Sequence, residues 1–404
     1  MEFHRPLLAN GKIAPLSWEI RLFFLNVNWP IKEHAKLFMR VYHQAMLVLG
    51  FLFFCYTNEA EMHYLVNHID DIGLALEGLA TYLILVEAHL RIYNKGFYQA
   101  SFKNFLDEFY QNIYMEEYLD KETYRDIQRK LLPTKMCSYS YILTVVTYFL
   151  VPVMGFFQHS NLVPFKTIFH YDLGIWYFYV PTLLVTLWIG VAVVSHLSAE
   201  SNLVATVILH LNARYLHLQQ ELKELQCKLS SDMKISTDRV LGEYRLAFID
   251  IIKRNVQYNE FAQKFQKQYS FCIFVMMAFS ATLLCVLGFK AATLGMTTKN
   301  ITFITWILGK IVELLVFGTL GSTLIETTNN MSSCYYMANW EDIILKSSHT
   351  LDNIKLMKLI TLAIELNQKP FYLTGYNYFN VSLATVIAIL QGAGSYFTFL
   401  YAFR

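Results

Sequence analysis

The sequence predicts an all-α integral membrane protein with seven transmembrane helices, a cytoplasmic N-terminus and an extracellular C-terminus. Composition and apolar runs predict the fold class. Hydrophobic residues make up 55% of the 404 residues and charged residues only 16%, whereas soluble domains have about 45–50% and about 25%. Seven apolar windows are long enough to cross about 30 Å of hydrocarbon at about 1.5 Å per residue. The distribution of Lys and Arg predicts the orientation.

The windows differ in how many charges they contain. The fourth and fifth are almost free of charge, whereas the second contains Glu77, Glu87 and His89. The N-terminal segment lacks the short apolar core and cleavage site of a signal peptide, so we expect the first span to act as its own signal. The predicted spans are 36–56, 72–92, 138–158, 174–195, 269–290, 302–325 and 377–400.

Basic residues alternate between the two sides of the predicted membrane. Of the 33 Lys and Arg, 28 fall in the N-terminal segment and in every second connection, four fall on the opposite side, and Lys310 lies inside the sixth window. Cytoplasmic connections retain Lys and Arg during insertion. The N-terminus is therefore predicted to lie in the cytoplasm.

This orientation divides the chain into membrane and cytoplasmic regions. The first 35 residues form a cytoplasmic segment, and residues 36–198 contain the first four spans. Helical extensions at 199–268 are cytoplasmic, spans five and six lie in 269–325, and a further cytoplasmic segment at 326–376 leads to the last helix at 377–404.

An apolar stripe follows the fourth span. Leu211, Tyr215, Leu218 and Leu222 recur at alternating steps of four and three, which is typical of a coiled-coil face. The stripe either packs within a helical hairpin of this chain or anchors the chain to another subunit. We favour a subunit anchor, because a stripe this long rarely buries itself completely.

No catalytic motif is found, and neither the His residues nor the six Cys show metal-ligand spacing. The net charge of +2 gives no indication of nucleic-acid binding. We therefore expect no enzyme, cofactor or metal site. Lys310 and Glu313, three residues apart on one helical face, are expected to pair inside the sixth span. The pair has either a gating role or a purely structural one that allows insertion.

Aromatic residues concentrate in the outer halves of spans three, four and six. They either form interfacial belts or line a pocket. Pro152 and Pro181 bend neighbouring spans, which favours a cavity suited to a small apolar molecule. The predicted pocket residues are Tyr148, Phe149, Phe156, Trp176, Tyr179, Phe303 and Trp306.

The last span carries more small and polar positions, Gln391 and Ser395 among them, than a lipid-facing helix needs. Close packing or contact with water explains them. A pore-lining helix contributed by each of several subunits fits this composition, because one helix cannot enclose a pore.

The C-terminal third resembles the insect odorant receptors. The resemblance rests on MSSCYYMANWED at 331–342, NQKPFYLTG at 367–375, and the YFNVSL and GSYFTFL segments near the end. Length, span number and topology extend it over the rest of the chain. The chain lacks the long insertion between spans four and five typical of the shared co-receptor, so it is similar to an odour-tuning subunit.

The resemblance implies a ligand-gated, non-selective cation channel that assembles with the co-receptor as a heterotetramer in the plasma membrane of olfactory sensory neurons. It implies that a volatile odorant binds in the outer half of the bundle and that the last helix lines the pore. By position, Phe399 matches the family's narrow gate, Phe403 lies about one turn further out, and Ala402 lies beside them. Alternatively, both phenylalanines anchor the helix at the outer interface.

Three other classes of protein are alternatives for this sequence. A gustatory receptor would carry a Gln-Phe pair in its final motif, which the YFTFLYAF ending lacks. A G-protein-coupled receptor needs an outer N-terminus and motifs of the DRY and NPxxY kind, which are absent. A secondary transporter would show repeated halves, and none is visible.

Overall fold

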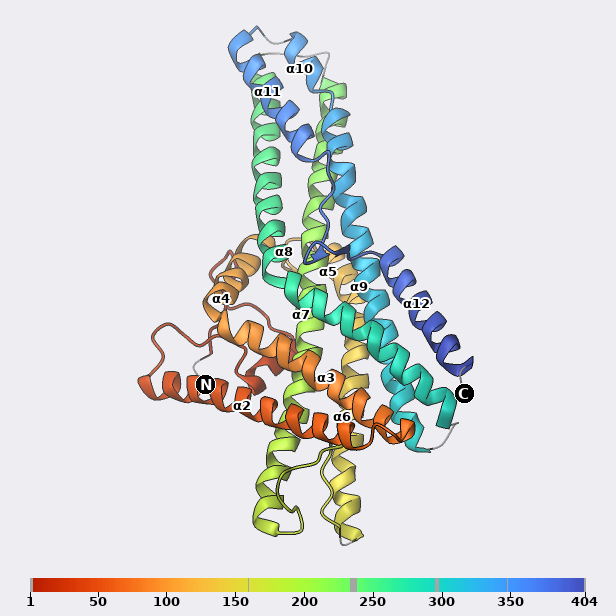
Figure 1. Ribbon diagram of the computed structural model, residues 1–404. Coiled ribbons are helices and arrows are strands. Elements are labelled where there is room, and N and C mark those ends of the chain that lie inside the picture. Colours follow the sequence, from red (N-terminus) through yellow and green to blue (C-terminus); the bar gives the residue numbers. More distant parts are fainter. Residues whose placement is uncertain (1–2, 159, 233–237, 295–297, 347, 403–404) are drawn as a thin grey trace.

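The computed structural model describes residues 3–158, 160–232, 238–294, 298–346 and 348–402. Helices dominate it and gather into one bundle, from which a narrower group of helices extends at one end (Figure 1). In order, the elements are α1 (Trp18–Arg21), the 3-10 helix η1 (Leu22–Asn26), α2 (Leu37–Asn67), α3 (Ile72–Phe97), α4 (Gln99–Glu108), the π turn η2 (Phe109–Ile113), α5 (Lys121–Lys130), α6 (Leu132–Phe157), α7 (Trp176–Asp232), α8 (Asp238–Leu294), α9 (Thr298–Tyr336), α10 (Trp340–Lys346), α11 (Thr350–Leu366), β1 (Thr374–Gly375), β2 (Phe379–Asn380) and α12 (Leu383–Ala402).

The predicted fold class is confirmed. In the described part of the chain, six helices are long and apolar enough to cross a membrane, and a shorter apolar helix covers Leu383–Tyr396. Four of the six begin within two residues of the predicted spans, whereas the segments that contain the third and fifth spans begin well before them, at Lys121 and Gly242. Many large apolar side chains on α2 and α6 point outward, among them Leu37, Phe38 and Leu143. Such exposure is stable only against hydrocarbon.

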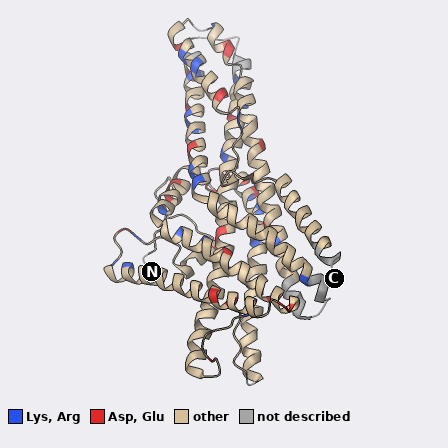
Figure 2. Cartoon of the chain, in the orientation of Figure 1, with Lys and Arg blue, Asp and Glu red and all other residues tan. Residues whose placement is uncertain are grey.

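Helices α7 and α8 each run for 57 residues, or about 85 Å at the α-helical rise. A bilayer core of about 30 Å covers less than half of that length. The end of α7 and the beginning of α8 lie side by side at the top of Figure 1, beside the end of α9 and the short helices α10 and α11. Charged residues are frequent along these extensions and rare on the lower ends of α6 and α7 (Figure 2).

Two prolines sit inside helices without ending them. Pro152 lies within α6 and Pro181 within α7, as neighbouring segments in a membrane bundle can satisfy the backbone groups that a proline frees. Local signals fix other helix starts: the side chain of Asp71 accepts a hydrogen bond from the Leu74 amide at the start of α3, which is a standard N-cap.

The last span begins later than the sequence predicted. The helix starts at Leu383, because residues 374–380 form a small antiparallel hairpin in which Thr374 pairs with Asn380. Tyr376 and Asn377 turn the hairpin with φ of 48° and 60°, the left-handed region that tight hairpins use. The chain then passes α9 at Gly321, where an added Cβ would meet the Val381 carbonyl oxygen. Close approach of the backbone therefore requires glycine there.

Candidate ligand cavity and buried charge network

An apolar cavity lies between α3, α6, α7 and α9. It holds about 530 Å³ of space between atoms, including its open mouth. Aliphatic residues such as Ile84, Leu85 and Val193 form much of the wall, and the hydroxyls of Thr81 and Thr144 are its small polar groups. The aromatic side chains that line it are Tyr141, Tyr148, Phe149, Phe165 and Trp306.

The loop between α6 and α7 closes one side of the cavity, to which it contributes Pro164 and Phe165. Backbone and side-chain contacts attach this loop to α2 and α3. The Ile168 amide donates to the Ala60 carbonyl at 3.0 Å, and the Lys166 ammonium lies 3.4 Å from a Glu77 carboxylate oxygen. The loop therefore lies over the cavity as a covering segment.

Three of the seven predicted pocket residues line the cavity: Tyr148, Phe149 and Trp306. Tyr179 lies outside the lining and donates its hydroxyl to the Leu162 carbonyl. The side chain of Phe303 lies outside the described part of the chain.

Phe156 and Trp176 are not among the lining residues of this cavity and are 78% and 68% exposed. Phe156 lies in the last turn of α6. Trp176 is the first residue of α7. Both positions suit contact with lipid or its headgroups.

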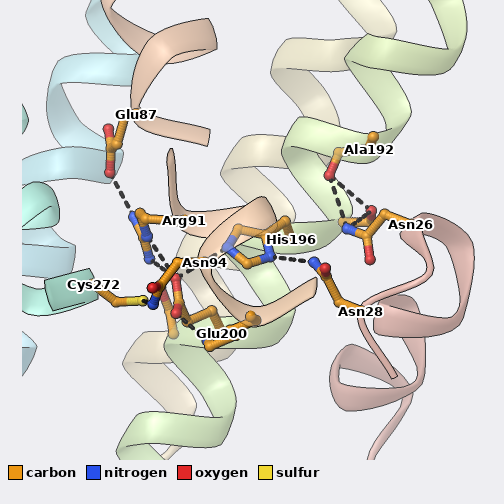
Figure 3. Close-up of polar contacts among 12 residues, drawn as sticks. Asn26, Asn28, Glu87, Arg91, Asn94, Ala192, His196, Glu200 and Cys272 are labelled. Atoms are coloured by element: carbon orange, nitrogen blue, oxygen red, sulfur yellow. Dashed lines mark hydrogen bonds and ion pairs between the residues drawn. The ribbon is translucent and has the colours of Figure 1, made fainter. Parts of the chain in front are cut away.

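A buried cluster of charged residues lies next to the cavity, further along α3, and only part of it was predicted from the sequence. Glu87, Arg91 and Lys95 occupy successive turns of α3, and all three are at most 1% exposed. The Arg91 guanidinium contacts both Glu87 and Glu200 of α7 at 2.5 Å (Figure 3). Lys95 also pairs with Glu200 and lies 4.5 Å from the centre of the Tyr269 ring.

Lys310 and Glu313 of α9 complete this cluster. The Lys310 ammonium lies 3.1 Å from Glu313 and 3.2 Å from Glu87. Glu313 also accepts hydrogen bonds from the hydroxyls of Tyr141 at 2.7 Å and Ser201 at 2.6 Å. We refer to Glu87, Arg91, Lys95, Glu200, Lys310 and Glu313 as the charge network.

The charge network is neutral overall, because its three carboxylates match its three cations. Isolated buried charges are very costly, and pairing offsets that cost only when the remaining hydrogen-bonding groups are also satisfied. Polar neighbours help to satisfy it: His196 lies 3.2 Å from Glu200 and is hydrogen-bonded on its other nitrogen to Asn28 (Figure 3). The network therefore ties α3, α7 and α9 to the N-terminal segment.

The four residues predicted to anchor another subunit are core residues of this chain. Leu211, Tyr215, Leu218 and Leu222 are at most 1% exposed. They belong to one continuous core with Phe248 of α8 and Leu324 of α9. The stripe is covered from within the chain because the end of α9 and helix α11 pack beside the hairpin. These side chains therefore offer no surface to a second subunit.

Helix α12 lies at the edge of the bundle against α8 and α9 (Figure 1). Its residues Gln391, Ser395 and Phe399 are exposed, Phe399 to 56%. Phe403 and the side chain of Ala402 lie outside the described part of the chain. A single chain thus leaves open the face of α12 that carries the predicted pore residues.

Comparison with known proteins decides the family. The model of the seven-transmembrane odorant receptor family matches residues 71–394. The chain belongs to the insect odorant receptor family. Odorant receptor 74a of Drosophila melanogaster is 40% identical over the full length of both chains. Odorant receptor 35a of the same species is 35% identical, covering 98% of this chain and 96% of the relative.

The fold agrees with this membership. The solved structure of the olfactory receptor OR5 from Machilis hrabei, determined in complex with eugenol, has a TM-score of 0.71 and 13% identity, covering 96% of this chain and 98% of that one. The same receptor solved without that ligand gives the same values. Membership of this family confirms the expectation that the chain is not an enzyme. The relatives also confirm the prediction of an odour-tuning member, as opposed to the co-receptor.

Proposed function

We propose that this odorant receptor is the odour-tuning subunit of a ligand-gated, non-selective cation channel, assembled with the co-receptor as a heterotetramer in the plasma membrane of olfactory sensory neurons. Its N-terminus lies in the cytoplasm. The observation that carries the proposal is the apolar cavity at Tyr148, Phe149 and Trp306, in a chain of this family.

The cavity suits a small, largely apolar odorant bound mainly by dispersion and burial of apolar surface. An odorant of about ten heavy atoms at about 0.5 kcal/mol each gains about 5 kcal/mol, which corresponds to a dissociation constant on the order of 0.1–1 mM. Tighter binding requires a closer fit to the wall. The hydroxyls of Thr81 and Thr144 donate to carbonyls of their own helices, so they can only accept a hydrogen bond from an odorant that carries a donor.

Channel opening needs only a difference in odorant affinity between the closed and open states. Tyr141 supplies a physical link, since its ring lines the cavity and its hydroxyl contacts Glu313 on α9. Helix α9 packs against α12. In this proposal a bound odorant changes the packing of α6 on α9, and α9 moves the pore helix with its residues Gln391, Ser395 and Phe399.

Voltage-clamp recording with an odorant panel tests the assignment. We expect odorant-evoked cation currents in cells that express this chain together with the co-receptor, and none in cells that express either protein alone. Currents from this chain alone would contradict the tuning-subunit role. Odorant-driven flux without channel conductance would instead support a transporter.

A further inference from the structure

A second cavity lies away from the odorant cavity, between the N-terminal segment, the π turn η2, α5 and the extension of α7. It holds about 620 Å³ of space between atoms, including its mouth, and shares no lining residue with the first cavity. Ser17, Tyr110, Tyr124, Gln128, Lys135 and His210 contribute polar groups to its wall. By the distribution of basic residues, it opens on the cytoplasmic side.

His210 is one of the residues that line this cavity. The ring is fully buried, and its Nδ1 accepts a hydrogen bond from the Met115 amide at 3.0 Å. A nitrogen that accepts carries no proton, so the proton of the neutral ring is on Nε2. That Nε2 is buried and has no hydrogen-bond partner among the described residues. An unsatisfied buried donor is unfavourable, and a bound acceptor would relieve it.

His210 stays neutral under physiological conditions. Burial lowers its pKa to about 3, and the positive charge of Arg214 contributes in the same direction. Arg214 itself is engaged with the carbonyls of Ile113 and Tyr114 at 2.8 and 2.9 Å. These contacts hold the segment after η2 in place, so the wall that carries Tyr114 is fixed beside His210.

The rest of the wall carries a positive charge. Lys135 contributes an ammonium group, which also lies 3.4 Å from the Gln128 side-chain oxygen. Ser17 accepts from the Ile20 amide, which leaves its hydroxyl hydrogen available. None of the described residues that line the cavity is Asp or Glu; Glu19, which is buried next to Ile20, is not part of the lining. Leu16, Ile20 and Leu131 add an apolar side.

We propose that this cavity binds an anionic group with acceptor oxygens, a carboxylate or phosphate, through the His210 Nε2–H and the Lys135 ammonium. Charge-assisted hydrogen bonds of this kind are among the stronger ones in proteins. The apolar side accommodates a hydrocarbon attached to the anion. The group is either a free cytoplasmic anion or the headgroup of an inner-leaflet lipid, and the site is independent of odorant binding.

Thermal unfolding of the full-length chain tests the site. The chain is placed in phosphatidylcholine nanodiscs, and its melting temperature is measured in inorganic phosphate and in chloride at equal ionic strength. A second sample contains phosphatidic acid in the nanodisc. A ligand at about ten times its Kd raises the melting temperature by roughly 1–3 °C. A rise with phosphate indicates a free anion, and a rise with phosphatidic acid alone indicates a lipid headgroup. No rise in either sample overturns the proposal.

Paired variants separate the site from general electrostatics. In His210→Asn, the amide oxygen can still accept from Met115 but the donor to the cavity is lost, whereas His210→Gln retains an N–H near the position of Nε2. We expect Asn to weaken the anion-induced shift roughly tenfold in affinity and Gln to preserve much of it. If both variants shift as the wild type does, His210 is not a ligand and the proposal fails.

Lysine variants provide the second comparison and remain informative if the His210 variants do not fold. Lys135→Gln should abolish the shift. Lys130→Gln, at an exposed position paired with Asp126 at 2.7 Å, should leave it unchanged. Equal loss in both lysine variants would show that net charge, not the cavity, produces the shift, and would overturn the proposal.

Discussion

Tyr141 of α6 donates a hydrogen bond to the Glu313 carboxylate of α9 at 2.7 Å, and its ring lines the ligand cavity. One side chain therefore touches both the space proposed for the odorant and the charge network that joins α3, α7 and α9. This placement makes Tyr141 the first residue to test for coupling between ligand and channel.

Tyr141→Phe should reduce the odorant response while preserving the cavity wall, because the ring remains and only the contact with Glu313 is lost. Loss of a hydrogen bond to a charged group costs roughly 1.5–3 kcal/mol. We expect the maximal odorant current to fall several-fold relative to the current evoked by a co-receptor agonist in the same cell. Tyr139→Phe, on the exposed face of α6, is the control. If the ratio of odorant current to co-receptor agonist current is the same in both variants, Tyr141 does not have this coupling role.

Phe149→Leu and Trp306→Leu should shift the odorant dose-response to higher concentration, because each removes apolar surface from the cavity wall. The loss of about 1–2 kcal/mol corresponds to roughly five- to thirtyfold in the half-maximal concentration. Phe156→Leu and Trp176→Leu, both outside the cavity, should leave it unchanged. The opposite pattern would place the odorant elsewhere.

Gly190→Ala should discriminate between odorants by size. The added Cβ would lie 3.3 Å from a ring carbon of Phe149 and 3.5 Å from a methyl group of Val145, so it narrows the cavity. We expect bulky odorants to lose roughly tenfold in potency and the smallest active odorants to lose little. Gly242→Ala, where an added Cβ meets open space, is the matched control. A uniform loss across the panel would indicate misfolding.

Lys310→Met should strongly destabilise the receptor, by roughly 3–5 kcal/mol, because it leaves Glu87 and Glu313 with an uncompensated buried charge. The double variant Lys310→Met/Glu313→Gln restores neutrality and should recover part of that stability. For both variants, surface labelling measures the amount of receptor at the cell surface and thermal unfolding in detergent measures its stability. Lys346→Met, at an exposed position on α10, should be neutral. A double variant no more stable than Lys310→Met would argue against charge balance as the cause.

The pair of Glu221 and Arg254 should make the extension of α7 and α8 sensitive to acid. Burial alone would raise the pKa of Glu221, but the bidentate hydrogen bonds and charge of Arg254 lower it below its usual value. A carboxyl with a lowered folded-state pKa stabilises the protein above its unfolded pKa of about 4.3 and loses that contribution as pH falls through the folded value. Arg254→Met should therefore lower the melting temperature at pH 7 and have less effect below about pH 4.

Exposed Lys253 provides the control for this pair. Lys253→Met should change the melting temperature little at either pH. If Arg254→Met has the same effect at both, packing of its side chain outweighs the ion pair.

The fold class could be predicted from the sequence, because long apolar windows and the uneven distribution of basic residues depend only on residues near one another in the chain. The cavity followed only in part. Tyr148 and Phe149 of α6 line it, but depth along a helix does not tell which side a residue faces, and Phe156 of the same helix is not among the lining residues. Phe165 was missed because its position depends on the path of a loop, which no periodicity describes.

Part of the charge network has a recognisable pattern in the sequence. Glu87, Arg91 and Lys95 are spaced by four residues, which places them on one helical face, and they mark the second span as unusual. Their partner Glu200 could not be found from spacing, because the contact joins distant segments. The stripe at Leu211 and Tyr215 was correctly seen as a buried surface but assigned to the wrong partner, since periodicity does not reveal what covers a helix.

The neutrality of the charge network also bears on how the receptor is made. Helix α3 is synthesised long before α7 and α9, so Glu87, Arg91 and Lys95 enter the translocation machinery more than a hundred residues ahead of Glu200. Glu87, inside the predicted second span, has Arg91 as a partner within α3 itself. Lys95 lies past the end of that span at residue 92, and its carboxylate partner is on α7. We therefore expect the last contacts of α3 with the bundle to form only after α7 and α9 have been synthesised.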